Sequence, residues 1–344
     1  MVKTTLVGDR GDADLVRTLQ TANIHPLWDR YQTIIPIEPS ATDAAMHWRW
    51  RDMEPLTERA ANEVPLEDLE RRALIMVNPA FGGETVATAN LIGGFTVLEP
   101  GDRAPRHRHT APAIRFGVAS DGAATIVNGR RCEMGKGDLV LTPPMCWHGH
   151  INDSGGRTVW FDALGSPLTN LLDASFFEPG GSEDNAQWSV DEGDERLWES
   201  AGMMDVNAET EPAHSPKFHY PGADARRLLE SMSAGPDGSR TLRYLNPMTG
   251  DAVMYTLDCY MMRLGKDAAT RPKRSTHNAI VHVVAGEGRT TVGEKTFEWS
   301  ERDVFTLPHW EWASHEAVNG EADLFLATDR TVYERLGILR EEIR

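Results

Sequence analysis

An internal repeat constrains the fold of this chain more than any other feature. Residues 137–143 read Gly-Asp-Leu-Val-Leu-Thr-Pro, and residues 302–308 read Arg-Asp-Val-Phe-Thr-Leu-Pro. Each copy lies among short apolar runs separated by glycine or proline, the pattern of strands and tight turns in sandwiches and barrels. Asn128-Gly129 in the first half is a two-residue hairpin signal. The chain is therefore predicted to be mainly β, with two barrels of one design.

The repeat divides the 344 residues into four expected parts. In order they are a helical N-terminal segment over 1–70, a metal-binding barrel over 71–165, a linker with short helices over 166–245 and a metal-free barrel over 246–344. The apolar residues Leu15, Val16 and Leu19 have helical spacing, which supports a helix in the first part.

Three histidines in the first half have a spacing suited to a metal site. His107 and His109 are two residues apart, so on a β-strand their imidazoles share one face. His148 follows the proline turn after residues 137–143. If the strands close into a small barrel, three neutral imidazoles converge on one interior point. They suit a divalent first-row metal such as iron, zinc or copper and leave coordination positions open for a substrate.

The second half of the repeat lacks these ligands. When the glycine turns and the proline turns are aligned, Lys273, Ser275 and either Trp312 or Ala313 take the places of the three histidines. We therefore expect one metal per chain. Four other histidines of this half miss the motif positions, and we expect them in core or interface packing: His277, His282, His309 and His315.

Charge and cysteine content narrow the class of protein. The formal net charge of −17 repels polyanions, so we expect neither nucleic acid nor a membrane surface as a partner. No run approaches the roughly 20 apolar residues of a spanning helix, and the first residues lack the apolar core of a signal peptide. Cys132, Cys146 and Cys259 are too few for a disulfide framework. We expect a soluble, cytoplasmic protein.

Two adjacent arginines, Arg71 and Arg72, precede the apolar run 73–77. Guanidinium groups make bidentate contacts with carboxylates. The two arginines therefore either bind the carboxylate of a substrate or form an ion pair with Glu67 or Asp68. The residues alone leave both interpretations open.

Several motifs in one order resemble the gentisate 1,2-dioxygenase family, which includes salicylate and 1-hydroxy-2-naphthoate dioxygenases. These motifs are Glu-Arg-Arg to Asn-Pro at 70–79, Pro-Gly-Asp at 100–102, His-Arg-His-Thr at 107–110, Ile-Arg-Phe at 114–116, Gly-Asp to Thr-Pro at 137–143 and Trp-His-Gly-His at 147–150. The resemblance is strong between about residues 70 and 162 and looser over the C-terminal barrel. It implies a bicupin fold, that is, two double-stranded β-helix (jelly-roll) barrels.

The resemblance also implies an activity. This is the O₂-dependent cleavage of an aromatic ring between its carboxyl-bearing carbon and the neighbouring hydroxyl-bearing carbon, in aromatic catabolism, by a homo-oligomer that is commonly a tetramer. One Fe(II) per chain would be held by His107, His109 and His148. Three neutral ligands leave the ion its full double charge, which the carboxylate and phenolate of a salicylate-type substrate can neutralise by chelation.

Further residues take roles from the same resemblance. Arg115 and Arg71 (or Arg72) would hold the substrate carboxylate. His150 would be a hydrogen-bonding or acid–base group, and Asp162 would orient His150 or an arginine.

One departure from the family bears on the substrate. About eleven positions before His107 the family often carries Gln, whereas this chain has Thr96. Gly94 and Ala73 are also small. These small residues predict a cavity that is roomier or less polar near the substrate ring. Such a cavity favours salicylate or a 5-substituted salicylate, such as 5-nitrosalicylate, over gentisate.

Two alternatives remain. Another cupin metalloenzyme, such as an isomerase or a diketone dioxygenase, often adds a glutamate ligand, but residues 110–120 contain no acid. A non-catalytic bicupin that binds a small molecule needs no open metal site beside arginines. Oxygen uptake in the presence of hydroxybenzoates distinguishes the dioxygenase from both.

Overall fold

The computed structural model describes residues 13–39, 43–66, 71–119, 122–180 and 213–344. The chain forms two compact units, Met1–Ser40 and Ala41–Arg344. The first contains the helices α1 (Ala13–Thr21) and α2 (Tyr31–Ile34), and none of their described residues is buried. Among the described residues, no helix has both the length and the apolar character needed to cross a bilayer.

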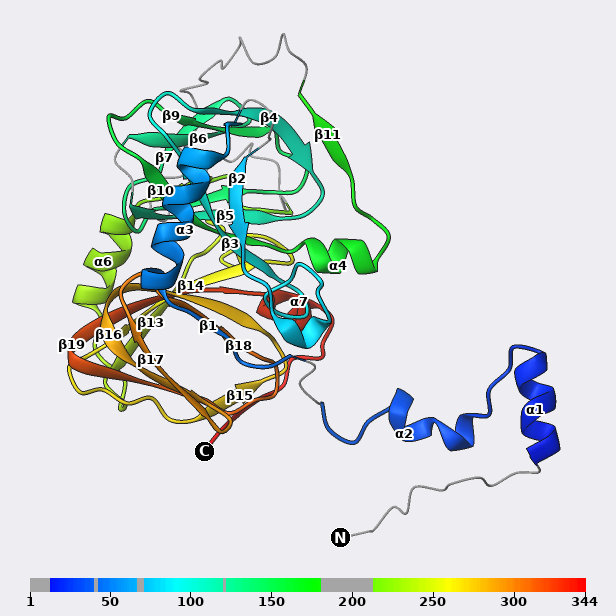
Figure 1. Cartoon of the computed structure of the whole chain (residues 1–344). Helices are drawn as coiled ribbons and strands as arrows, with labels where there is room; N and C mark the ends of the chain where they lie inside the picture. Colours follow the sequence, from blue (N-terminus) through cyan, green and yellow to red (C-terminus); the bar gives the residue numbers. More distant parts are fainter. Residues whose placement is uncertain (1–12, 40–42, 67–70, 120–121, 181–212) are drawn as a thin grey trace. The chain divides into compact units, whose positions relative to one another are not determined.

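The second unit consists mainly of antiparallel strands that form two barrels, coloured cyan to green and yellow to red in Figure 1. Two sheets make the first barrel. The six-stranded sheet contains, in spatial order, β12 (His219–Tyr220), β8 (Leu139–Thr142), β5 (Ala113–Ala119), β10 (Thr158–Leu164), β3 (Ile92–Leu98) and β2 (Arg72–Ile75). The five-stranded sheet contains β11 (Phe177–Pro179), β4 (Arg103–His109), β9 (His148–Asn152), β6 (Ala123–Val127) and β7 (Arg130–Glu133).

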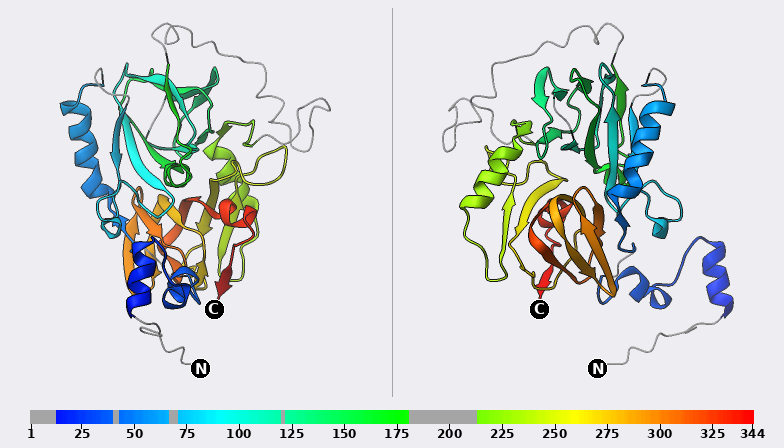
Figure 2. Two further views of the ribbon diagram at one scale, coloured as in Figure 1. Left: turned by 90° about the vertical axis from the view of Figure 1, so that its right-hand side faces the viewer. Right: turned by 60° about the vertical axis from the view of Figure 1, so that its left-hand side comes forward.

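One nine-stranded sheet makes the second barrel, whose curvature is visible in the right-hand view of Figure 2. Its main path runs through β1 (His47–Trp48), β18 (Val304–Leu307), β16 (Ala279–Val292), β19 (Ala313–Thr328), β14 (Asp258–Leu264) and β13 (Ser239–Arg243). The remaining strands are β15 (Lys273–Ser275), β17 (Lys295–Ser300) and β20 (Glu341–Ile343). The mainly β, two-barrel prediction is confirmed.

Backbone geometry confirms the predicted hairpin and extends the repeat. Asn128 and Gly129 join β6 to β7 with φ angles of 47° and 85°, the left-handed values that two-residue hairpin turns require. Met145 and Trp310 follow the two copies of the repeated motif at the same distance, and both have a φ of 60°. The similarity of the halves thus reaches the turn that leads into β9 and β19.

Short strands from the two segments outside the predicted barrels pair with barrel strands. β1 lies within the segment 1–70, where only helices are expected, and pairs with β18 of the second barrel. Within 166–245, the helices α4 (Ser166–Leu171) and α6 (Gly222–Ser231) are present, but β11 and β12 pair with strands of the first barrel and β13 with β14. The segments 1–70 and 166–245 therefore contribute strands as well as helices.

A shared apolar core joins the barrels. Phe116 of β5 stacks on Phe325 of β19, with ring centroids 4.0 Å apart. His282 of β16 is buried among Phe95, Phe116 and Phe161 of the first barrel. The expectation that His282 serves core packing is confirmed, and the contacts fix the first barrel against the second.

Candidate metal centre

Three histidines of the five-stranded sheet converge at one point. His107 and His109 lie on β4 and His148 on the adjacent β9, where His107 and His148 are direct cross-strand partners. One ring nitrogen from each lies within 4.8 Å of the others. Among the described residues, this is the one group of three or more ligating side chains with such geometry. The predicted convergence of the three imidazoles is confirmed.

Backbone carbonyls fix the tautomer of each imidazole. Nδ1 lies 3.0 Å from the Pro105 carbonyl oxygen in His107, 2.7 Å from that of Ala111 in His109 and 2.9 Å from that of Cys146 in His148. A carbonyl oxygen only accepts, so each Nδ1 carries the proton and donates. Each Nε2 therefore presents its lone pair, because a hydrogen bond from Nδ1 to a carbonyl oxygen leaves the other ring nitrogen free to bind a metal.

The environment keeps these imidazoles neutral. Burial, and then the guanidinium of Arg71, lowers the pKa of His107 to about 3. Burial, and then Arg115, lowers the pKa of His109 to about 4. Burial also holds the pKa of His148 well below its ordinary value. At neutral pH the three rings are thus uncharged, which is the form in which imidazole binds a metal.

Unsatisfied nitrogen at the centre fits a bound cation. Nε2 of His148 is buried and has no hydrogen-bond partner among the described residues. Nη2 of Arg71 contacts Nε2 of His107, so that lone pair also points into the centre. Because buried polar atoms are normally satisfied, the unpartnered Nε2 of His148 indicates a ligand-binding position. The donor set of three neutral imidazoles suits a divalent first-row metal.

Arg115 forms a buried cationic group next to the histidines. It lies on β5 opposite Asp162 of β10, with Nε 2.9 Å from Oδ1 of that carboxylate. Burial lowers the pKa of Arg115 to about 10, partly offset by Asp162, so the guanidinium remains charged at neutral pH. Its Nη2 is buried without a hydrogen-bond partner among the described residues. Arg115 can therefore donate to an incoming anion.

His150 lies two residues beyond His148 on the same face of β9 and is fully buried. Its Nδ1 is 2.8 Å from Oγ1 of Thr125, its cross-strand partner on β6. Its Nε2 has no hydrogen-bond partner among the described residues. Burial, and then Arg115, holds the pKa of His150 well below its ordinary value, so the ring is neutral.

The two adjacent arginines point in opposite directions. Arg71 reaches His107, whereas Arg72 donates to the Val64 carbonyl oxygen at 2.8 Å and pairs with Asp102 at 2.7 Å. Arg71 directly precedes β2, whose first residue is Arg72, and successive side chains of extended backbone face opposite sides, which accounts for the difference. The structure brings Arg71 to the centre and places Arg72 in an ion pair outside it.

The small residues proposed to shape the pocket lie on β2 and β3. Thr96 is fully buried, and its hydroxyl donates to Oδ2 of Asp162, while Ala73 is its cross-strand partner. A Cβ on Gly94 would lie 2.8 Å from the Leu74 carbonyl oxygen, so the close approach of β2 requires glycine there. Packing between strands thus accounts for Gly94.

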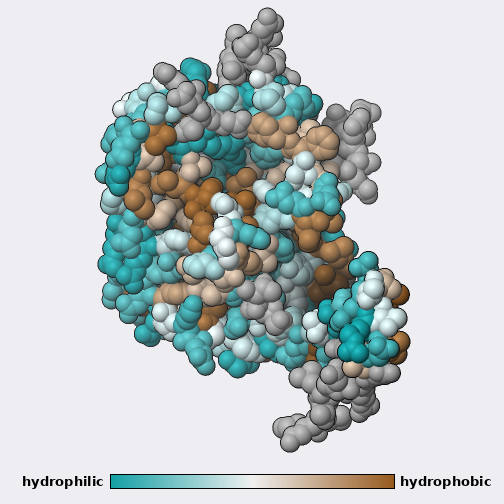
Figure 3. Space-filling view, turned by 45° about the vertical axis from the view of Figure 1, so that its right-hand side comes forward, coloured by the Kyte–Doolittle hydropathy of each residue, from teal (hydrophilic) through white to brown (hydrophobic). Residues whose placement is uncertain are grey.

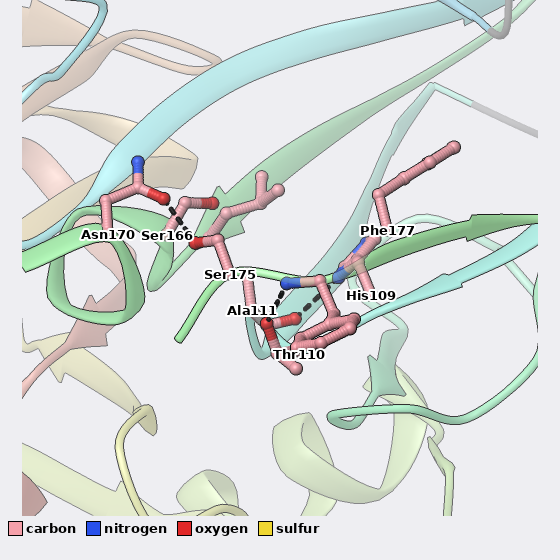
Figure 4. Close-up of a pocket in the computed structure, with 9 residues that line it drawn as sticks. His109, Thr110, Ala111, Ser166, Asn170, Ser175 and Phe177 are labelled. Atoms are coloured by element: carbon pink, nitrogen blue, oxygen red, sulfur yellow. Dashed lines mark hydrogen bonds between the residues drawn. The ribbon is translucent and has the colours of Figure 1, made fainter. Parts of the chain in front are cut away.

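A cavity of about 300 Å³ opens beside His109 (Figure 4). Its lining comprises His109, Thr110, Ala111, Leu164, Ser166, Asn170, Ser175, Phe176 and Phe177. Phe177 pairs with His109 across β11 and β4 and stacks on His107, with ring centroids 5.4 Å apart. Ala73, Gly94 and Thr96 are not part of this described lining. Phe177 was not predicted, because a three-residue exposed strand leaves no periodic signal.

The second barrel lacks the centre, as its sequence predicts. Lys273 and Ala313 are cross-strand partners in the way that His107 and His148 are in the first barrel. The same register replaces further polar residues by apolar ones: Val281 for Arg115, Leu326 for Asp162 and Met262 for Thr96. His315 takes the place of His150, because it pairs with Thr290 and lies 2.8 Å from its hydroxyl. The three-histidine group thus belongs to the first barrel.

Buried neutral histidines predict loss of stability in acid. The pKa is lowered to about 3 in His282 and to about 4 in His277 and His315, in addition to the shifts at the centre. The unfolded chain takes up these protons below its ordinary histidine pKa of about 6.5 and the folded chain does not, so stability falls as pH drops below that value. We expect each buried histidine to contribute a loss of about 1 kcal/mol at pH 5.5.

Urea unfolding of the metal-free protein at pH 7.5 and 5.5 measures this loss. Between pH 7.5 and 8.5 the histidines are neutral in both states and contribute no change, which supplies the control. An unfolding free energy that is equal at pH 7.5 and 5.5 would contradict the assignment.

Comparison with known proteins identifies the family. The cupin domain family matches residues 94–164. The chain is 35% identical over 327 residues to gentisate 1,2 dioxygenase 1 of Aquipseudomonas alcaligenes, with 94% of each chain covered. It is 35% identical over 334 residues to 5-aminosalicylate 1,2-dioxygenase of Comamonas sp, with 93% of this chain and 87% of that protein covered.

A solved structure supports the same family. Salicylate 1,2-dioxygenase from Pseudoaminobacter salicylatoxidans, crystallised as an adduct with gentisate, matches the fold with a TM-score of 0.90 at 30% identity. The match covers 99% of this chain and 97% of that one. The chain therefore belongs to the gentisate and salicylate 1,2-dioxygenase family of bicupin, ring-cleaving oxidoreductases.

Proposed function

We propose that this protein is an Fe(II)-dependent dioxygenase that uses O₂ to open a salicylate-type aromatic acid between its carboxyl-bearing and hydroxyl-bearing carbons. The observation that carries the proposal is the set of three Nε2 lone pairs directed to one point beside a buried, charged Arg115. One ferrous ion per chain would be held by His107, His109 and His148. When bound, it supplies Lewis acidity toward the substrate oxygens and the redox chemistry that O₂ requires.

The charge of the pocket favours an anionic substrate. Arg71 contacts His107, and Arg115 pairs with the carboxylate of Asp162, so two guanidinium groups stand against one carboxylate among these side chains. They therefore carry an excess of positive charge before any metal adds to it. The unpaired Nη2 of Arg115 would donate to the substrate carboxylate. The lone pair of His107 Nε2 serves only one partner at a time, so metal binding would redirect Arg71 from that nitrogen toward the same carboxylate.

His150 is proposed as the group that exchanges a proton with the ring hydroxyl. Its imidazole is neutral and its Nε2 is buried without a partner among the described residues, so it can accept a proton when the hydroxyl ionises. Asp162 is proposed to orient Arg115. Phe177 and Phe176 give the cavity beside His109 an apolar wall suited to an aromatic ring.

The substrate preference is proposed from Thr96. Its one hydroxyl proton is used by Asp162, so Thr96 offers no donor to a 5-hydroxyl on the ring. We therefore expect salicylate and 5-substituted salicylates to be turned over at rates at least comparable to that of gentisate. The dioxygenase activity and the substrate preference are tested together by steady-state kcat/KM on gentisate, salicylate and 5-nitrosalicylate. The protein is first loaded with ferrous iron under anaerobic conditions. A gentisate value far above the others would overturn the preference alone, and no oxygen uptake with any acid would favour a binding protein.

We also propose that the protein assembles as a homo-oligomer, such as a tetramer, in the cytoplasm. Large apolar side chains are exposed in the first unit: Leu15, Ile24, Leu27, Trp28, Tyr31, Ile34, Ile35 and Ile37. Leu171, Leu172 and Phe176 are also exposed, and Figure 3 shows apolar side chains gathered on the face that carries α4 and β11. Apolar surface of this kind supports subunit contact. The three free, buried cysteines support a reducing compartment.

A further inference from the structure

Trp160 contacts two of the groups on which the proposed function depends. It lies on β10 two residues before Asp162, hence on the same face, and is fully buried. Its indole Nε1 donates to Oδ1 of Asp162 at 2.9 Å. Its ring packs on the imidazole of His150, with centroids 5.1 Å apart. One side chain thus connects the six-stranded sheet with the histidine strand β9.

Two hydrogen bonds and one ion pair determine the orientation of the Asp162 carboxylate. The indole of Trp160 and Nε of Arg115 both lie 2.9 Å from Oδ1, and the Thr96 hydroxyl donates to Oδ2. If the indole N–H is removed, one oxygen keeps a single partner and the carboxylate gains freedom to rotate. Because Arg115 is held through that oxygen, its guanidinium would then lose its fixed direction.

The second barrel shows that the fold does not need this indole. Leu324 takes the place of Trp160. Trp160 lies two residues before Asp162, the cross-strand partner of Arg115, and Leu324 lies two residues before Leu326, the cross-strand partner of Val281. The threonine–histidine pair, by contrast, is kept in both barrels. The indole thus occurs together with the arginine and aspartate and is absent where they are absent.

We propose that Trp160 is a positioning residue for substrate binding. Its N–H fixes Asp162, which directs Arg115 at the substrate carboxylate, and its ring supports His150. The inference rests on the proposed function, because it assigns Trp160 to the binding of that aromatic acid. The metal ligands are held separately, by the backbone carbonyls of β4 and β9 and their adjoining turns.

The variant Trp160→Phe tests the proposal because it keeps an aromatic ring and removes the N–H. We expect the Kd for salicylate, titrated anaerobically into the ferrous protein, and the KM to rise about tenfold, the effect of losing one hydrogen bond to a charged group. The iron content should stay at the wild-type level, and kcat should change less than KM.

Trp299→Phe is the matched control. Trp299 is also buried, and its Nε1 donates to the Thr290 hydroxyl at 2.8 Å in the second barrel. We expect both variants to lower Tm, but only Trp160→Phe to change the Kd. Equal Kd values in the two variants would overturn the inference and leave only a packing role for Trp160.

A second variant keeps the test decisive if Trp160→Phe does not fold. Thr96→Val removes the donor to the other oxygen of Asp162 at nearly constant volume, and we expect a smaller rise in Kd with unchanged iron content. An unchanged Kd there would also overturn the inference. Wild-type protein that holds iron but binds none of the hydroxybenzoates would overturn the proposed function itself, and the inference with it.

Discussion

Replacing His148 by alanine is expected to abolish iron binding and, with it, all oxygen uptake. His148 supplies the buried Nε2 that has no other partner among the described residues, and two imidazoles cannot retain a divalent ion that three hold. The same loss is expected for His107→Ala and His109→Ala. Iron bound per chain, measured after ferrous loading and desalting, should fall from one in the wild type to a background level.

The control is His277→Ala in the second barrel. His277 is largely buried and its Nδ1 lies 3.2 Å from the Asn278 carbonyl oxygen, but it lies outside the three-histidine group. It should keep a full complement of iron. If His148→Ala retained wild-type iron while folded, the ligand assignment would be wrong.

Replacing Arg115 by alanine is expected to weaken binding of the aromatic acid by about 2 kcal/mol or more, which is roughly a 30-fold rise in Kd. The guanidinium is fully buried, so its contact with a substrate carboxylate would be made without competition from water. Truncation also leaves Asp162 as an unpaired buried carboxylate, and stability should fall as well. Anaerobic titration of the ferrous variant with salicylate measures the Kd directly.

The variant Arg263→Ala separates the loss of stability from the loss of substrate affinity. Arg263 forms a bidentate, largely buried pair with Asp323 in the second barrel, at 2.7 and 2.8 Å. Its truncation should lower the unfolding free energy without changing the Kd. A Kd in Arg115→Ala equal to that of the wild type would remove Arg115 from the carboxylate contact.

The convergence of the three histidines could be predicted from the sequence because strand alternation and the internal repeat together specify it. His107 and His109 are two apart on a strand, and the repeat aligns their partner His148 with a residue that is not a ligand, Ala313. The mainly β fold followed from the same alternation of strand and turn. These signals are local or repeated, so they need no knowledge of the tertiary structure.

Other parts of the site depend on contacts that no local pattern encodes. Which of Arg71 and Arg72 lies near the three histidines depends on which face of β2 meets the barrel interior, and the pairing of Ala73 with Thr96 defines that face only in the folded chain. Phe177 reaches the site on a three-residue strand after a helix. The place of Trp160 could have been predicted from the sequence, since Trp160 lies two residues before Asp162 on one strand and so on the same face.

The product formed under ¹⁸O₂ tests the central claim most directly. Ferrous-loaded protein is mixed with salicylate and its 5-substituted analogues in buffer of ordinary water, and the ring-opened acid is examined by mass spectrometry. The account predicts one O₂ consumed per ring opened and both labelled oxygen atoms in the product. An intact ring with every acid tried, or a product whose new oxygen comes from water, would contradict it.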